Sequence, residues 1–121
     1  MDRLRFALLE HQTSEGVHWD LLIEVRDRER LATWRIYADP RGRSDPVPCE
    51  RIADHRPLYL DYEGPISGNR GRVRRIDAGT AQWIDLHRDQ AVFELRGEHL
   101  CGRYAIRPGG GGLELSTTGG D

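Results

Sequence analysis

Lysine is absent from this sequence of 121 residues, and all 18 of its basic side chains are arginine. The absence excludes a nucleotidyl ligase that carries its intermediate on a lysine, and it excludes a Walker A site with its phosphate-binding lysine. A genome rich in guanine and cytosine is the simplest explanation for the bias itself.

Long apolar runs and a cysteine framework are also lacking. No stretch approaches the roughly 18 apolar residues of a transmembrane helix. The apolar run at residues 6–9 is followed at once by Glu10, which makes it too short for the core of a signal peptide. Cys49 and Cys101 show no framework spacing. We therefore expect a cytoplasmic protein with free thiols and no membrane partner.

The net charge of −2 is too small to create a strong field around the whole molecule. Any contact with nucleic acid must therefore come from a local patch of arginine side chains. The length suits one domain with a modest core and one site.

Short alternating apolar segments fill most of the chain. Residues 17–25 alternate most clearly, with apolar Trp19 and Leu21 on one face and polar His18 and Asp20 on the other, although Leu22 interrupts the polar face. Comparable strands are expected at residues 5–10, 30–37, 58–62, 72–77, 80–86, 91–95 and 100–106.

Many short strands at similar spacing, with little helical pattern, predict a mainly all-β fold. We expect a small antiparallel β-barrel, closed or partly open, that occupies residues 1–107. Residues 108–121 are rich in glycine and polar side chains, and this composition predicts a disordered tail.

The pattern His18-x-Asp20 is the first candidate for chemistry. Residues i and i+2 of a strand point to the same side, so an imidazole and a carboxylate would converge, as suits a divalent transition metal. If the chain reverses at residues 14–16, His11 falls beside His18 and completes a site with open positions. The competing interpretation is a surface histidine beside a surface aspartate.

Two further segments carry polar side chains that suit phosphate. His55 is followed by Tyr59, and the pair could contact a phosphate or donate a proton, although an exposed loop histidine is an ordinary alternative. Arg70, Arg72 and Arg74 would share a strand face and form a stripe that binds a nucleic-acid backbone. Exposed charged strands without such a role are also common.

In their order and spacing, these segments resemble the 3′-phosphoesterase domain of bacterial ligase D. The resemblance runs from about Arg5 to Arg107. It is carried by His11, His18-Trp19-Asp20, Trp34, Asp54-His55, Pro57-Leu58-Tyr59, Tyr62-Glu63-Gly64 and the closing segment Leu95-Arg96-Gly97-Glu98-His99-Leu100-Cys101-Gly102-Arg103-Tyr104.

The resemblance implies a manganese-dependent activity on the 3′ end of DNA or of RNA-tipped DNA, which removes a terminal ribonucleoside and then the 3′-phosphate. By this resemblance, His11, His18 and Asp20 would hold Mn²⁺ or another divalent transition metal. His55 would contact the scissile phosphate, and Tyr59 would hydrogen-bond to it. A separate ligase or polymerase is an expected partner.

The sequence also departs from the pattern that it resembles. Leu22 stands where the family has arginine, Leu9 where it has glutamine, and Ala53 where it has glutamate, and one extra residue separates His11 from His18. We expect an arginine from residues 70–75 to replace the missing one.

The departures leave two other functions open. One is a catalytically inactive module that binds nucleic-acid ends or a repair partner. The other is a cupin-like iron oxygenase, because two histidines and a carboxylate also resemble its facial triad.

Overall fold

The computed structural model describes residues 3–118, which form β-strands and one short 3₁₀-helix, η1 (Pro57–Leu60). The strands are β1 (Leu4–Thr13), β2 (Gly16–Ile23), β3 (Leu31–Ile36), β4 (Val47–His55), β5 (Gly64–Pro65), β6 (Arg72–His87), β7 (Gln90–Gly97), β8 (Cys101–Gly109) and β9 (Gly112–Thr117). No α-helix occurs in the described residues, so the all-β prediction is confirmed. Within the same residues, no helix has the length and apolar character needed to cross a membrane.

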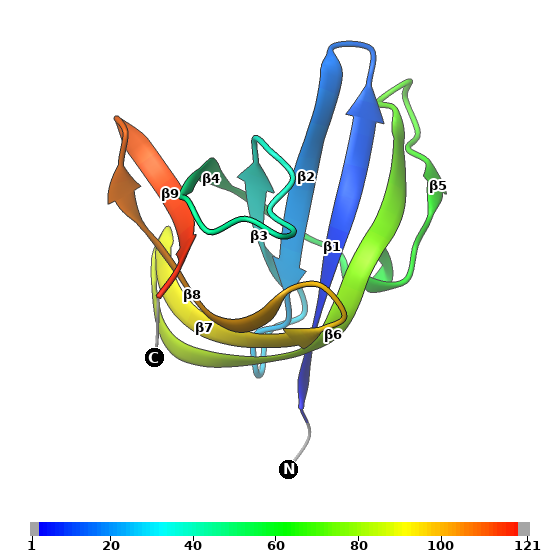
Figure 1. Cartoon of the computed structure of the whole chain (residues 1–121). Helices are drawn as coiled ribbons and strands as arrows, with labels where there is room; N and C mark the ends of the chain where they lie inside the picture. The colour runs from blue at the N-terminus through cyan, green and yellow to red at the C-terminus, as the bar shows by residue number, and fades with distance from the viewer. Residues whose placement is uncertain (1–2, 119–121) are drawn as a thin grey trace.

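The strands form one antiparallel sheet that curls into a ring (Figure 1). Its order is β1-β2-β3-β4-β9-β8-β7-β6-β5, and pairing of β1 with β6 closes the ring. Strand β6 curves, so that its first part pairs with β1 and its second part pairs with β7. The separate strands expected at 72–77 and 80–86 are therefore one continuous strand.

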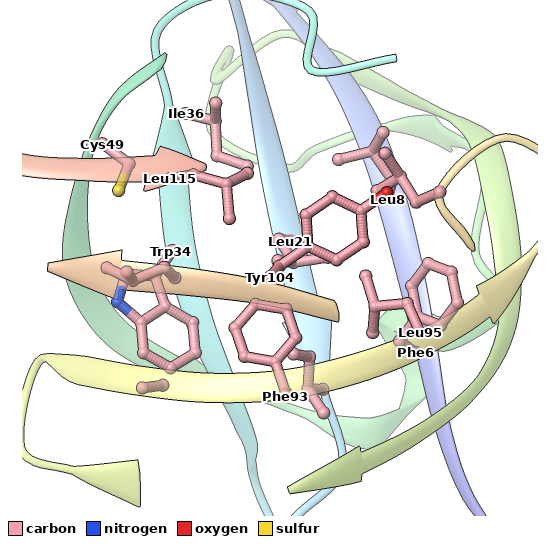
Figure 2. Close-up of a cluster of buried hydrophobic side chains, with 14 of the residues drawn as sticks. Phe6, Leu8, Leu21, Trp34, Ile36, Cys49, Phe93, Leu95, Tyr104 and Leu115 are labelled. Carbon is pink, nitrogen blue, oxygen red and sulfur yellow. The ribbon is translucent and has the colours of Figure 1, made fainter. Parts of the chain in front are cut away.

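The main hydrophobic core fills the inside of the ring (Figure 2). Trp34, Phe93 and Trp83 pack with ring centroids 5.7 to 6.4 Å apart, and Tyr104 stacks on Phe93 at 6.2 Å. These aromatic side chains contribute a large share of the buried area that stabilises so small a domain.

A second apolar cluster lies on the outside of β1 and β2. It consists of Ala7, Leu9, Leu22, Leu31, Leu60 and Val73. Paired residues of antiparallel strands share a face, and Ala7 pairs with Leu22. This explains why Leu22 interrupts the polar face of its strand: the outer side of the hairpin is itself covered.

The outer cluster is covered by η1 and the segment after it, and not by the strand expected at residues 58–62. Pro57 sets the backbone for the first helical position, and the N–H of Tyr59 donates to the carbonyl of Arg56. Leu60, which is 2% exposed, then packs into the outer cluster. The strand prediction was wrong because alternation over only five residues does not identify a strand, and Leu58 is exposed while Leu60 is buried.

The prediction of a disordered tail from residue 108 was wrong over the part of that segment that is described. Strand β9 pairs with β8 and with β4, and its Leu115 is 3% exposed within the main core. Gly110 and Gly111, with φ of 58° and 88°, make the tight turn between β8 and β9. The glycines that resembled a flexible tail are the turn of a hairpin, while residues 119–121 lie outside the described chain.

A candidate metal centre beside two pockets

The β1–β2 hairpin brings the predicted ligands together. His11 is paired directly with His18, and Leu9 with Asp20. The two-residue reversal at residues 14–15 is organised by Thr13, whose hydroxyl donates to the carbonyl of Gly16 and accepts from the N–H of Glu15. The turn expected at residues 14–16 thus sets the register that places two imidazoles side by side.

The three side chains form a compact cluster. One potential ligand atom from each of His11, His18 and Asp20 lies within 4.8 Å of the others. Nδ1 of His11 is 3.6 Å from one Asp20 carboxylate oxygen, and Nε2 of His18 is 3.5 Å from the other. Divalent metals lie about 2 Å from nitrogen and oxygen ligands, so atoms within 4.8 Å of one another are close enough to share one ion.

The backbone carbonyl of Arg70 selects the tautomer of His11. Nε2 of His11 donates to this oxygen at 2.7 Å, which leaves the lone pair of Nδ1 directed toward Asp20. The loop approaches so closely because residue 71 is glycine, with φ of +86°, and a Cβ there would lie 2.0 Å from the carbonyl oxygen of Gln12. Gly71 therefore helps to hold a metal-ligating orientation.

The polar atoms of this cluster fit a bound cation. Asp20 is 2% exposed, and neither its Oδ1 nor Nε2 of His18 has a hydrogen-bond partner among the described residues. Buried polar atoms normally have partners, so orphaned atoms at one point indicate a missing ligand. Two imidazoles and a carboxylate suit manganese, iron or zinc, and the arrangement leaves coordination positions open.

The same cluster shifts the pKa values of its histidines in opposite directions. The Asp20 carboxylate raises the pKa of His11, because it stabilises the protonated ring. Burial lowers the pKa of His18, because the charged ring loses solvation. Both rings must be neutral to bind a metal, so proton competition at this centre begins at His11.

A pocket of about 390 Å³ opens on one side of the cluster and contains the second predicted pair. His55 and Tyr59 line it together with His11 and Asp20, and the His55 and Tyr59 rings meet edge to face at 5.5 Å. Nδ1 of His55 lies 3.0 Å from the carbonyl of Ala53, to which it donates, so its Nε2 is the nitrogen that can meet a ligand.

The three arginines predicted to form one stripe are not brought together. Arg70 precedes β6 and lines the pocket, with its side chain hydrogen-bonded to Ser67. Arg72 and Arg74 alternate with Val73, and it is Val73 that pairs with His11 and lines the pocket. Arg74 instead forms an ion pair with Glu10 at 3.0 Å. Arg72 and Arg74 share a face of β6 as predicted, because they are two residues apart on one strand, whereas Arg70 lies before the strand begins at Arg72.

Other arginines line the pocket that the sequence pattern did not single out. They are Arg30, Arg35 and Arg56. Arg35 alternates with buried Trp34 on β3 and pairs with Asp20 across the sheet. A single charged residue in a strand whose other side chains are uncharged was the signal that could have drawn attention to it.

Two of the three positions that depart from the family pattern lie in the apolar outer cluster. Leu9 and Leu22 are 1% and 0% exposed in the outer cluster beside Asp20. Ala53 lines the pocket and presents its carbonyl to His55. On the side of the centre formed by Leu9 and Leu22, a bound phosphate would therefore find no polar side chain from these two positions.

The closed all-β sheet and the histidine–aspartate cluster define a small β-protein with a candidate metal centre on its outer face. The family model of the DNA ligase D 3′-phosphoesterase domain matches residues 9–107. The match covers most of the chain, and the protein belongs to this family. No curated protein matches the sequence.

Proposed function

We propose that the protein is a divalent-metal-dependent phosphoesterase that processes 3′ ends of nucleic acid in DNA repair. Family membership favours end processing by hydrolysis of a phosphate ester. The observation that carries metal dependence is the convergence of His11, His18 and Asp20 with orphaned buried atoms. The same match to the chain favours this function over an iron oxygenase.

The side chains divide the work by their positions. A divalent metal at the triad, Mn²⁺ by preference, would polarise a phosphoryl oxygen of the terminal phosphate. As an imidazolium, His55 would keep its Nδ1–H on the Ala53 carbonyl and donate from Nε2 to the phosphate or to the leaving oxygen, and the hydroxyl of Tyr59 would hydrogen-bond to the phosphate. Arg70 lies at the edge of the pocket, where its charge would attract the phosphate backbone.

The direct test uses purified protein, manganese, and a primer–template that ends in a single ribonucleotide or in a 3′-phosphate. We expect loss of both terminal groups, and we expect His18→Ala to abolish it. The matched control is His87→Ala, which removes an exposed histidine of β6 and should leave the rate unchanged.

A binding module without catalysis is the second candidate, and the apolar Leu9 and Leu22 beside Asp20 favour it. If the wild-type protein binds manganese and a 3′ end but leaves both substrates intact, this second function replaces the first. A cytoplasmic location and a separate ligase or polymerase as partner are further predictions of the repair role.

A further inference from the structure

Arg35 lies at the junction of two pockets that meet at the metal centre. The first pocket is the one that contains His55 and Tyr59. The second, of about 550 Å³, runs along the β1–β2 hairpin past His18 and Tyr37. Among the described residues, three line both pockets: His11, Arg35 and Arg70. A ligand that crosses from one pocket to the other must therefore pass Arg35.

Arg35 is the least exposed of the arginines around the first pocket. Arg30, Arg56 and Arg70 are exposed, whereas Arg35 is half-buried near the end of β3. Arg70 is already hydrogen-bonded to Ser67, and the guanidinium of Arg56 lies 6.0 Å from the Tyr59 ring centroid. An ionic contact gains strength as water is excluded, so Arg35 is the pocket arginine best placed to bind an anion.

The bonding of Arg35 is incomplete in the part of the chain that the structure describes. Its Nε is buried and has no hydrogen-bond partner there. Asp20 and Glu50 flank it across β3, yet neither carboxylate forms an ion pair with it in residues 3–118. Glu50 instead accepts a short hydrogen bond from the Tyr37 hydroxyl, and the Arg35 side chain is itself hydrogen-bonded to Tyr37, which leaves Nε as the donor without an acceptor. A buried guanidinium N–H without an acceptor indicates a ligand that supplies one.

We propose that Arg35 binds the terminal phosphate group at the metal centre. It would make the anion contact that residue 22, a leucine, cannot make. The planar guanidinium can present two N–H donors to two phosphate oxygens, while the triad lies directly across the β2–β3 pairing. Leu22 is two residues beyond Asp20 on β2, and Arg35 pairs with Asp20 from the neighbouring strand β3. Both positions are therefore close to Asp20, and Arg35 can reach a phosphate bound there. The proposal rests on the proposed phosphoesterase function and names the residue that gives it phosphate specificity.

The first test measures binding without turnover. In EDTA, wild-type protein is titrated with one oligonucleotide that ends in a 3′-phosphate and with the same oligonucleotide that ends in a 3′-hydroxyl. We expect about tenfold tighter binding of the phosphate end, loss of that preference in Arg35→Gln, and its retention in Arg107→Gln, which removes an exposed arginine of β8. An unchanged preference in Arg35→Gln overturns the proposal.

The second test adds manganese and measures removal of the 3′-phosphate. Arg35→Gln should lower kcat/KM by about 100-fold, as loss of one donor to a developing charge does elsewhere, while its manganese affinity stays equal or rises. A purely structural Arg35 would instead lower the melting temperature and leave the preference for phosphate intact in the folded protein. Arg35→Lys keeps the charge but loses the planar pair of N–H donors, so its kcat/KM should lie between those of wild type and Arg35→Gln. It replaces Arg35→Gln in the test if that variant does not fold.

The two tests separate this inference from the proposed function. If wild-type protein is inactive with manganese but its preference for a 3′-phosphate depends on Arg35, the phosphoesterase function fails and the binding role of Arg35 stands. If the protein is active and Arg35→Gln matches wild type in both tests, the function stands and the role of Arg35 fails.

Discussion

Asp20 and Asp77 are both buried carboxylates, 2% and 6% exposed, but their surroundings differ. The carboxylate of Asp77 accepts hydrogen bonds from backbone N–H groups of four residues: Ala78, Glu98, His99 and Leu100. Asp20 receives none of this support. Its oxygens face two histidines at 3.5 and 3.6 Å, and Oδ1 has no hydrogen-bond partner in the described chain.

The two carboxylates lie on opposite sides of β1, because Asp77 pairs with Leu8 and Asp20 pairs with the next residue, Leu9. Burial alone therefore does not distinguish a structural carboxylate from a ligand. The carboxylate of Asp77, whose oxygens accept these hydrogen bonds, joins β6 to the turn between β7 and β8 and stabilises the fold. The carboxylate of Asp20 has lone pairs available for a cation, which His11 and His18 would also ligate.

Asp20→Asn should have the largest effect, and that effect should fall on function. The amide is nearly the same size but lacks the charge that holds a divalent cation. We expect activity on a 3′-phosphate to fall by about 10³-fold, equivalent to roughly 4 kcal/mol of transition-state stabilisation. Urea unfolding of the metal-free protein, measured above the pKa of His11, should change by less than about 1 kcal/mol, because the carboxylate then faces two neutral rings and its Oδ1 has no hydrogen-bond partner in the described chain. A stability loss as large as that of Asp77→Asn would remove the distinction between the two residues.

Asp77→Asn should have the opposite profile. An amide cannot accept bonds at both ends, so some of the N–H groups of the turn lose their acceptor while they stay buried. We expect a loss of about 3 kcal/mol in the free energy of unfolding, measured in urea. The manganese affinity of the folded protein should equal that of wild type. A weaker metal site with unchanged stability would show that Asp77 acts on the centre and not on the turn.

Manganese itself should stabilise the fold, and this stabilisation should depend on Asp20 but not on Asp77. At a free concentration near 100 times its Kd, it should add about 2.7 kcal/mol to the free energy of unfolding, because it binds only the native state. The increase should persist in Asp77→Asn and disappear in Asp20→Asn. Thermal melts with and without EDTA measure it, and magnesium at the same concentration tests whether the effect needs a metal that favours imidazole ligands.

The strand pattern of the sequence identified most of the ring, because alternation of apolar and polar residues reports which face of a strand is buried. It failed where one turn of 3₁₀-helix imitated a strand at residues 58–62. It failed again at Gly110 and Gly111, because composition does not distinguish a glycine hairpin turn from a flexible tail. Closure of the ring by β1 and β6 was also beyond local patterns, since it depends on pairing between distant segments.

The metal triad was predictable because its geometry is local. A two-residue reversal and the period of a strand bring His11, His18 and Asp20 together without knowledge of the rest of the fold. Arg35 was missed because it reaches the centre through the pairing of β2 with β3. Arg70 was misplaced because β6 begins only at Arg72.

The pH dependence of manganese binding should show the smallest effect and separates the two histidines. Because Asp20 raises the pKa of His11 above its ordinary 6.5 and burial lowers that of His18, His11 takes up a proton first as the pH falls. Below the pKa of His11, manganese affinity should fall about tenfold per pH unit, and the slope should double only where His18 is also protonated.

The ring signals of both histidines, followed by NMR in the metal-free protein, measure these pKa values directly. In Asp20→Asn the pKa of His11 should move down toward its ordinary value, because the carboxylate that favours the charged ring is gone. Asp77→Asn should move neither pKa, since that carboxylate serves the β7–β8 turn. If His18 titrates above His11 in the wild-type protein, burial does not control His18 and the order of proton competition is reversed.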